Sequence, residues 1–126
     1  SQITGFGTVN VTELVSSVLV DWSMLYTVWL KSIDQTQPID EEKSKAIEAG
    51  FDCSMKILDL SQNYSLPVDM KPFIEIVLIT SCLRNEFEDK ILRSQALKSI
   101  LKVYSKGDDS KSQPEILLLL TKMINR

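Results

Sequence analysis

The side chains that most often carry out chemistry in proteins are scarce in this chain. It contains no histidine, so Ser/His and Cys/His nucleophilic pairs and the commonest metal ligand are missing. Its two cysteines, Cys53 and Cys82, lie far apart in the sequence, outside any ligand motif and within apolar patterns. We expect both to be buried thiols in a reducing compartment. The composition therefore predicts no catalytic residue, no cofactor and no metal site.

Carboxylates remain as candidates for acid–base chemistry, but they lie at expected helix starts or in a loop. The groups are Glu41 with Glu42, Glu86 with Glu88 and Asp89, and Asp108 with Asp109. An acidic side chain at a helix start is stabilised by the positive end of the helix dipole. None of these groups has the spacing of a calcium-binding loop. We interpret them as capping and solvated residues, and we expect a protein that is not an enzyme.

Basic residues form one stripe that could meet phosphates. Lys98, Lys102 and Lys106 are spaced one helical turn apart, with Lys90 and Arg93 upstream. Nucleic-acid binding through this stripe is one hypothesis, although no aromatic residues alternate with it as base stacking would need. The net charge of −3 and the isoelectric point of about 4.9 favour the alternative, a solvated outer face.

The elements that must position any site are helices, and the strongest pattern covers residues 10–33. A capping box from Asn10 to Glu13 precedes a continuous apolar stripe that contains both tryptophans. The stripe consists of Val11, Leu14, Val18, Trp22, Leu25, Trp29 and Ile33. Because a second apolar stripe adjoins it, we expect this helix to be the central one, covered by neighbours on most sides. Its charged residues divide the apolar run, so we expect no membrane span.

Four further helices are expected, at residues 40–63, 70–83, 86–105 and 114–125. The first of these is expected to start near Asp40, with Glu41 and Glu42 at the positive end of its dipole. Asp69 is the expected N-cap of the second, with Pro72 in its first turn. Gly50 lies inside a helix, where glycine costs about 1 kcal/mol against alanine, so we expect it to permit close approach of another helix.

These patterns predict an all-α fold, either a five-helix antiparallel bundle or a short HEAT-like array. No stretch is convincing as a strand, and the chain has only four glycines and four prolines. With 126 residues, one domain is expected. We assign residues 10–126 to this helical domain and residues 1–9 to a disordered or extended N-terminal segment.

The third and fourth expected helices resemble one HEAT repeat, the two-helix unit of α-solenoids. The second helix of such a unit often begins with Asp, followed by an aliphatic and Arg pair, then Ala and Leu. Here Asp89 to Ala96 reads Asp-Lys-Ile-Leu-Arg-Ser-Gln-Ala, and Ile100-Leu101 follows. Pro72, ahead of an apolar helix, is similar to the start of the first helix. The resemblance covers about a third of the chain, without a repeat period across it. It implies a stacked helical array that acts as a scaffold for partners, without catalysis.

The expected function is binding of other macromolecules. Val20, Met24 and Val28 interrupt the polar side of the first helix and would be exposed in a small bundle. Exposed apolar patches often mark an interface, so these are candidate partner-binding residues. We expect a non-enzymatic protein–protein interaction or scaffold domain, part of a larger protein or complex, that binds another protein or a second copy of itself. The alternative is a nucleic-acid-binding helical domain that uses Lys98 and Lys102.

The expected location is cytoplasmic or nuclear, because the chain shows no signal peptide. Two triplets, at Asn10 and Asn63, match the glycosylation acceptor pattern and leave a secreted protein as the alternative. Asn10 already has a capping role in our interpretation.

Overall fold

The computed structural model describes residues 10–105, together with Leu117 and Thr121. Within these residues the chain forms helices and no strand, which confirms the predicted all-α bundle. The helices are α1 (Val11–Lys31), α2 (Glu41–Asn63), α3 (Lys71–Leu83), α4 (Phe87–Leu92) and α5 (Ala96–Ser105). The N-terminal segment 1–9 and the helix expected at 114–125 lie outside the described residues, except that Leu117 and Thr121 are both helical.

The first helices begin where a side chain caps the free N–H groups of the first turn. Asn10 Oδ1 accepts a hydrogen bond from the Glu13 N–H at 3.2 Å, and Asp40 Oδ1 accepts one from Lys43 at 2.8 Å. The Asn10 cap was predicted from the sequence, whereas for α2 only the start near Asp40 was predicted. The expected cap of α3 at Asp69 is one residue early: Met70 is the N-cap, and Asp69 accepts from the Lys71 N–H at 3.1 Å.

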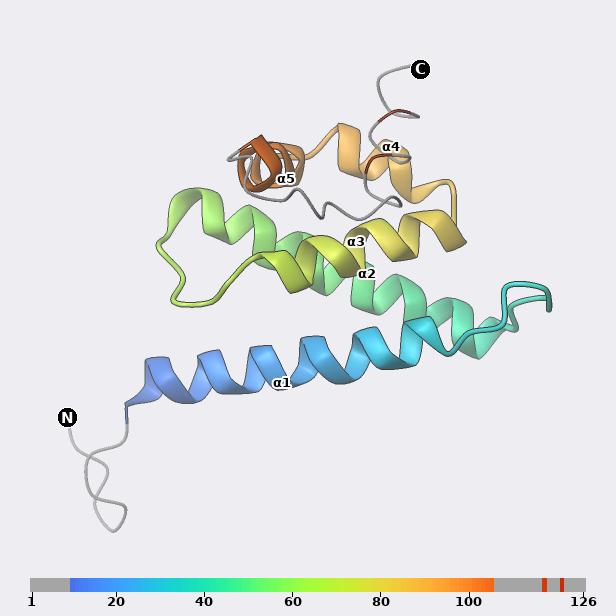
Figure 1. The fold of residues 1–126 in the computed structure, drawn as a ribbon, viewed down its shortest axis with the longest axis horizontal. Helices are drawn as coiled ribbons and strands as arrows, with labels where there is room; N and C mark the ends of the chain where they lie inside the picture. The colour runs from blue at the N-terminus through green and yellow to red at the C-terminus, as the bar shows by residue number, and fades with distance from the viewer. Residues whose placement is uncertain (1–9, 106–116, 118–120, 122–126) are drawn as a thin grey trace, which may run out of the picture.

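α3 is the most buried helix of the bundle and packs against α1, α2 and α4 (Figure 1). Seven of its thirteen residues are buried, among them Phe73, Ile74 and Val77. Two of the seven are polar, and their hydroxyls donate to carbonyl oxygens of α3 itself: Thr80 to Ile76 at 2.8 Å and Ser81 to Leu78 at 2.8 Å. The two buried hydroxyls of α3 therefore need no hydrogen-bond partner from another helix.

α1 lies on the outside of the bundle, so the prediction that it is the central helix is wrong. It packs mainly on α3, and its N-terminal turns extend past the start of α3 (Figure 1). Only Ser23 and Leu30 of its residues are buried. The apolar stripe showed which residues could be buried. Burial also requires neighbouring helices, and α1 has such neighbours on one side only within the described part of the chain.

The predicted helix 86–105 is two helices. α4 ends at Leu92, and residues 93–95 separate it from α5. Ser94 stabilises the break, because its hydroxyl donates to the Ile91 carbonyl at 3.0 Å and accepts from the Ala96 N–H at 3.2 Å. The break lies inside the segment that resembles a HEAT repeat, and that resemblance stays an expectation.

The cysteines also differ from the prediction. Cys53 and Cys82 are both exposed, not buried. They lie at the edges of the apolar stripes of α2 and α3, where a helix face turns from the core to solvent. An apolar pattern in the sequence shows that a residue lies near the boundary between core and solvent, but it does not show whether that residue is buried or exposed.

Gly50 permits a close contact between two helices, as predicted. A Cβ atom at Gly50 would overlap the ring of Tyr26 from α1. The Tyr26 hydroxyl donates to the Ala46 carbonyl at 2.7 Å, which joins α1 to the first half of α2. Burial raises the pKa of Tyr26 to about 12, so the phenol keeps its proton and this hydrogen bond.

Candidate protein-interaction surface

The candidate surface is the side of α1 that faces away from α3. Five apolar side chains lie on it, and each is more than half exposed. We call them the α1 outer face: Val11, Leu14, Val18, Leu25 and Val28. They are spaced by alternating steps of three and four residues, with Asp21 filling the one missing place. This is the spacing of the a and d positions of a heptad repeat.

The N-terminal half of α1 is uncovered even on the side that faces the core. Trp22 stacks on Phe73 of α3, with ring centroids 6.3 Å apart. Val15 lies two turns earlier on the same side of α1, yet it remains exposed. The helix has extended past α3 at this point (Figure 1). The bundle therefore leaves the first turns of α1 available to another molecule.

The three partner-binding residues predicted on α1 are exposed. Val20, Met24 and Val28 expose 37%, 62% and 69% of their surface. Met24 and Val28 also line a hollow of about 370 Å³ between α1 and the start of α3. The other lining residues are Ser23, Thr27, Asp69, Lys71, Pro72 and Glu75. Val28 is shared between this hollow and the α1 outer face.

Sequence reasoning missed four residues of the outer face: Val11, Leu14, Val18 and Leu25. It assigned them to the core, because they lie on the same stripe as the tryptophans. No signal in the sequence separates them from the covered residues of that stripe, because the apolar pattern is the same for both.

The two helices that carry predicted basic residues, α4 and α5, lie on the opposite side of the bundle from α1 (Figure 1). Lys98 and Lys102 are both exposed on α5. Lys90 lies on α4, where its amino group is 3.9 Å from Glu48 and 5.4 Å from the centre of the Phe87 ring. Because the helix breaks between Lys90 and Lys98, the basic residues do not form one continuous stripe. Lys106 lies outside the described residues.

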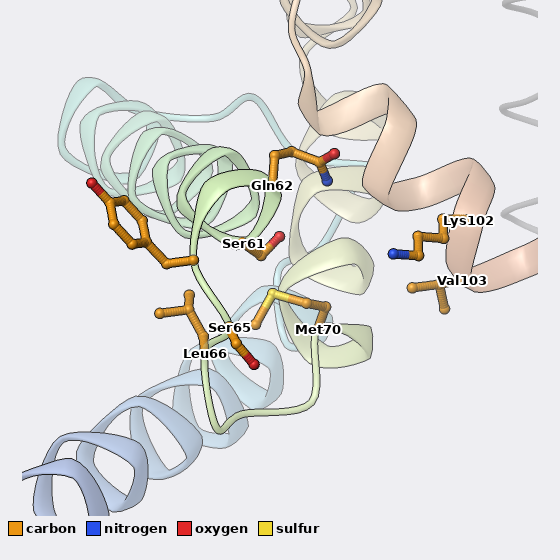
Figure 2. Close-up of a pocket in the computed structure, with 8 residues that line it drawn as sticks. Ser61, Gln62, Ser65, Leu66, Met70, Lys102 and Val103 are labelled. Atoms are coloured by element: carbon orange, nitrogen blue, oxygen red, sulfur yellow. The ribbon is translucent and has the colours of Figure 1, made fainter.

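A second hollow, of about 260 Å³, lies beside Lys102 and is shown in Figure 2. It is lined by Ser61, Gln62, Tyr64, Ser65, Leu66, Met70, Lys102 and Val103, from the end of α2, the α2–α3 connection and α5. Two of its polar side chains, Ser61 and Gln62, hydrogen-bond to the buried hydroxyl of Ser99. No carboxylate lines the hollow.

Other kinds of site are not seen in the described part of the chain. Its cysteine and carboxylate side chains do not come together in threes that could hold a metal ion. None of the helices in residues 10–105 is long and apolar enough to cross a membrane. The chain matches no protein-family model, no curated protein and no solved structure. The α1 surface is therefore a candidate interaction site on the basis of its structure alone.

Proposed function

We propose that this chain is a non-enzymatic protein–protein interaction domain that binds its partner through the α1 outer face. The observation that carries the proposal is the exposure of apolar side chains in the middle of a well-formed helix. Leu25 and Val28 expose 73% and 69% of their surface. Monomeric soluble proteins rarely expose a continuous apolar patch of more than a few hundred Å².

The core of the bundle does not need these side chains. Phe51, Phe73 and Phe87 are fully buried, and the Phe51 and Phe87 rings stack with their centroids 4.2 Å apart. α1 contacts this core through Trp22, Tyr26 and Leu30, which lie on its inner side. The outer face therefore adds nothing to the packing of one copy of the described domain.

Covering the outer face would stabilise a complex appreciably. Each half-exposed Val or Leu that becomes buried contributes on the order of 1–2 kcal/mol. Five such residues together match the association cost of about 4–15 kcal/mol, so the surface is large enough to matter.

The test is capture of partners with matched variants. The tagged chain is expressed in its own cells as wild type, Leu25→Glu and Leu60→Glu, and bound proteins are quantified by mass spectrometry. Leu60 is an exposed leucine of α2, so both variants make the same chemical change at the surface. We expect binding to be lost with Leu25→Glu alone. Equal capture by all three proteins, with unchanged helical circular dichroism, would contradict the proposal.

A further pair of substitutions locates the binding side of α1. Val20→Glu with Met24→Glu alters the side that borders the hollow and leaves Leu25 in place. If the outer face is the interface, this double variant weakens binding less than Leu25→Glu does. The reverse order would move the interface to the hollow between α1 and α3.

The second candidate function is nucleic-acid binding, favoured by the exposure of Lys98 and Lys102 one turn apart on α5. It requires affinity that falls steeply with salt, because bound phosphates release counterions. Charge reversal by Lys98→Glu with Lys102→Glu would then abolish binding to single- or double-stranded oligonucleotides. Binding that is unchanged by the reversal, or absent in the wild type at low salt, dismisses this candidate.

A further inference from the structure

We infer that the partner on the α1 outer face is α1 of a second copy of this chain, packed antiparallel across a two-fold axis. The inference rests on the proposed function and names the partner of the same surface. Four observations support it: the spacing of the apolar residues, their area, the charges along α1, and the access to it.

The spacing points to another helix as the partner. Val11, Val18 and Leu25 fall at a positions of three successive heptads, and Leu14 and Val28 fall at d positions. Such a stripe stays aligned with a single partner helix that crosses at about 20°. α1 has 21 residues and is about 31 Å long at 1.5 Å per residue. A second α1 has the same length and the same stripe.

The area reaches the size of a specific interface only when the partner presents an equal surface. The five side chains of the outer face, each more than half exposed, present on the order of 600 Å². Two copies would bury about 1,200 Å², the lower limit for a specific protein–protein interface. Val15 and Met24 flank the stripe, are also exposed, and would add to this area.

The charges along α1 select the antiparallel direction. In a parallel pair Asp21 would face Asp21 of the other copy within the apolar seam, which is unfavourable. In an antiparallel pair a positions face d positions, so Leu14 lies opposite Leu25, and Asp21 lies opposite Val18. This direction also opposes the two helix dipoles.

The position of α1 leaves room for the second helix. α1 forms one outer layer of the bundle, with α4 and α5 on the opposite side (Figure 1). A helix laid along the outer face would meet mainly α1, with the start of α3 near it at Val28. Asp21 in the seam limits the affinity, in the way that a single polar residue at a core position of a coiled coil costs stability while it fixes the register.

The first experiment is sedimentation equilibrium over a wide concentration range. The wild type and Leu60→Glu should pass reversibly from the chain mass of 14.3 kDa to twice that mass. Leu25→Glu should raise the dissociation constant at least about tenfold, and Asp21→Leu should lower it about tenfold. A wild type that stays monomeric throughout, or a dimer unaffected by Leu25→Glu and Asp21→Leu, overturns the inference.

The two proposals fail in different ways. If the wild type is monomeric but captures another protein, and Leu25→Glu abolishes that capture, the proposed interaction function stands and the dimer is rejected. A dimer that Leu25→Glu leaves intact, together with equal capture by all variants, rejects both.

The second experiment tests the direction by cross-linking. In a background with Cys53→Ser and Cys82→Ser, proteins carrying Leu14→Cys and Leu25→Cys are oxidised separately and as a mixture. The antiparallel pair predicts a disulfide between the two different proteins in the mixture and little in either protein alone. Efficient disulfide formation by Leu14→Cys alone would establish a parallel pair and overturn the proposed arrangement.

Discussion

α1 and α3 are both strongly apolar helices, yet only α3 is buried. Ile74 and Val77 of α3 have no exposed surface, whereas Leu25 and Val28 of α1 are mostly exposed. The difference lies in their neighbours, because α3 packs against α1, α2 and α4, while α1 packs mainly on α3. A helix that is apolar on every side can therefore be buried within its own chain, or it can present apolar residues that another chain would bury.

The two sides of α1 make the same point within one helix. On the inner side, Trp22 stacks on Phe73 and Tyr26 bonds to the Ala46 carbonyl, so the helix is fixed to the bundle. On the outer side, nothing in the described part of the chain covers Leu25. A helix held this firmly can present apolar side chains in a fixed arrangement, which lowers the entropy cost of binding.

The largest expected effect comes from comparing a leucine that is buried in the core of the bundle with a leucine of the α1 outer face, each shortened to alanine. Leu58→Ala, at a fully buried position of α2, should cost about 2–5 kcal/mol of unfolding free energy. Leu25→Ala should change the stability of the dilute monomer by no more than about 0.5 kcal/mol. Urea denaturation followed by circular dichroism measures both. Comparable losses would mean that the outer face is covered within a single copy.

The contact between α1 and α2 can be broken at Gly50. Gly50→Ala should destabilise the fold by about 1–3 kcal/mol, because the methyl group meets the Tyr26 ring and overpacks the helix contact. The control is the exposed neighbouring residue, where Ala49→Gly should cost up to about 1 kcal/mol through helix propensity alone. Thermal and urea denaturation give both values. A stabilising Gly50→Ala would show that α1 can move away from α2 at little cost.

Two buried serines in the core of the bundle differ in their hydrogen bonds. Ser54 Oγ has no hydrogen-bond partner among the described residues, whereas Ser99 Oγ bonds to Ser61, Gln62 and the Leu58 carbonyl. Ser54→Ala removes an unpaired buried hydroxyl and should stabilise by up to about 1 kcal/mol. Ser99→Ala should destabilise by about 1 kcal/mol, since it leaves its partners unsatisfied. In urea denaturation the midpoint of Ser54→Ala should lie above that of Ser99→Ala, and the reverse order would contradict this prediction.

Tyr26 gives the α1–α2 contact a pH dependence. Burial raises the pKa of this phenol from 10.0 to about 12. Between these values the folded state holds a proton that the unfolded state has lost, so the contribution to stability is complete below pH 10 and disappears as pH rises through 12. Stability should therefore fall less steeply above pH 10 in Tyr26→Phe than in the wild type. Tyr64→Phe, at an exposed position of the same chain, should follow the wild type.

Much of the local structure could be predicted from the sequence, because its causes are local. Asn10 caps α1 as expected, α2 starts at the expected place after Asp40, and Gly50 lies at a close helix contact. The break after Leu92 could not be seen, because the apolar period continues across it from Ile91 to Ala96. The burial of Ile91 before the break and of Ala96 after it depends on tertiary packing.

The candidate surface was predicted in part for the same reason. Val20, Met24 and Val28 stood out because they interrupt a polar side of α1, and they are exposed. Val11 and Leu25 share a stripe with Trp22, so no local signal separated the uncovered part of that stripe from the covered part. Only the positions of the other helices make that distinction.

Amide hydrogen exchange along α1, measured at increasing protein concentration, tests most directly whether the outer face is a binding surface. We predict that exchange of the α1 amides slows as the concentration rises, most strongly in the N-terminal turns that extend past the bundle, while exchange in α2 and α3 changes little. Leu25→Glu should remove this dependence. Exchange in α1 that is the same at every concentration, in a wild-type protein that also captures no partner, would contradict the assignment of α1 as the interaction surface.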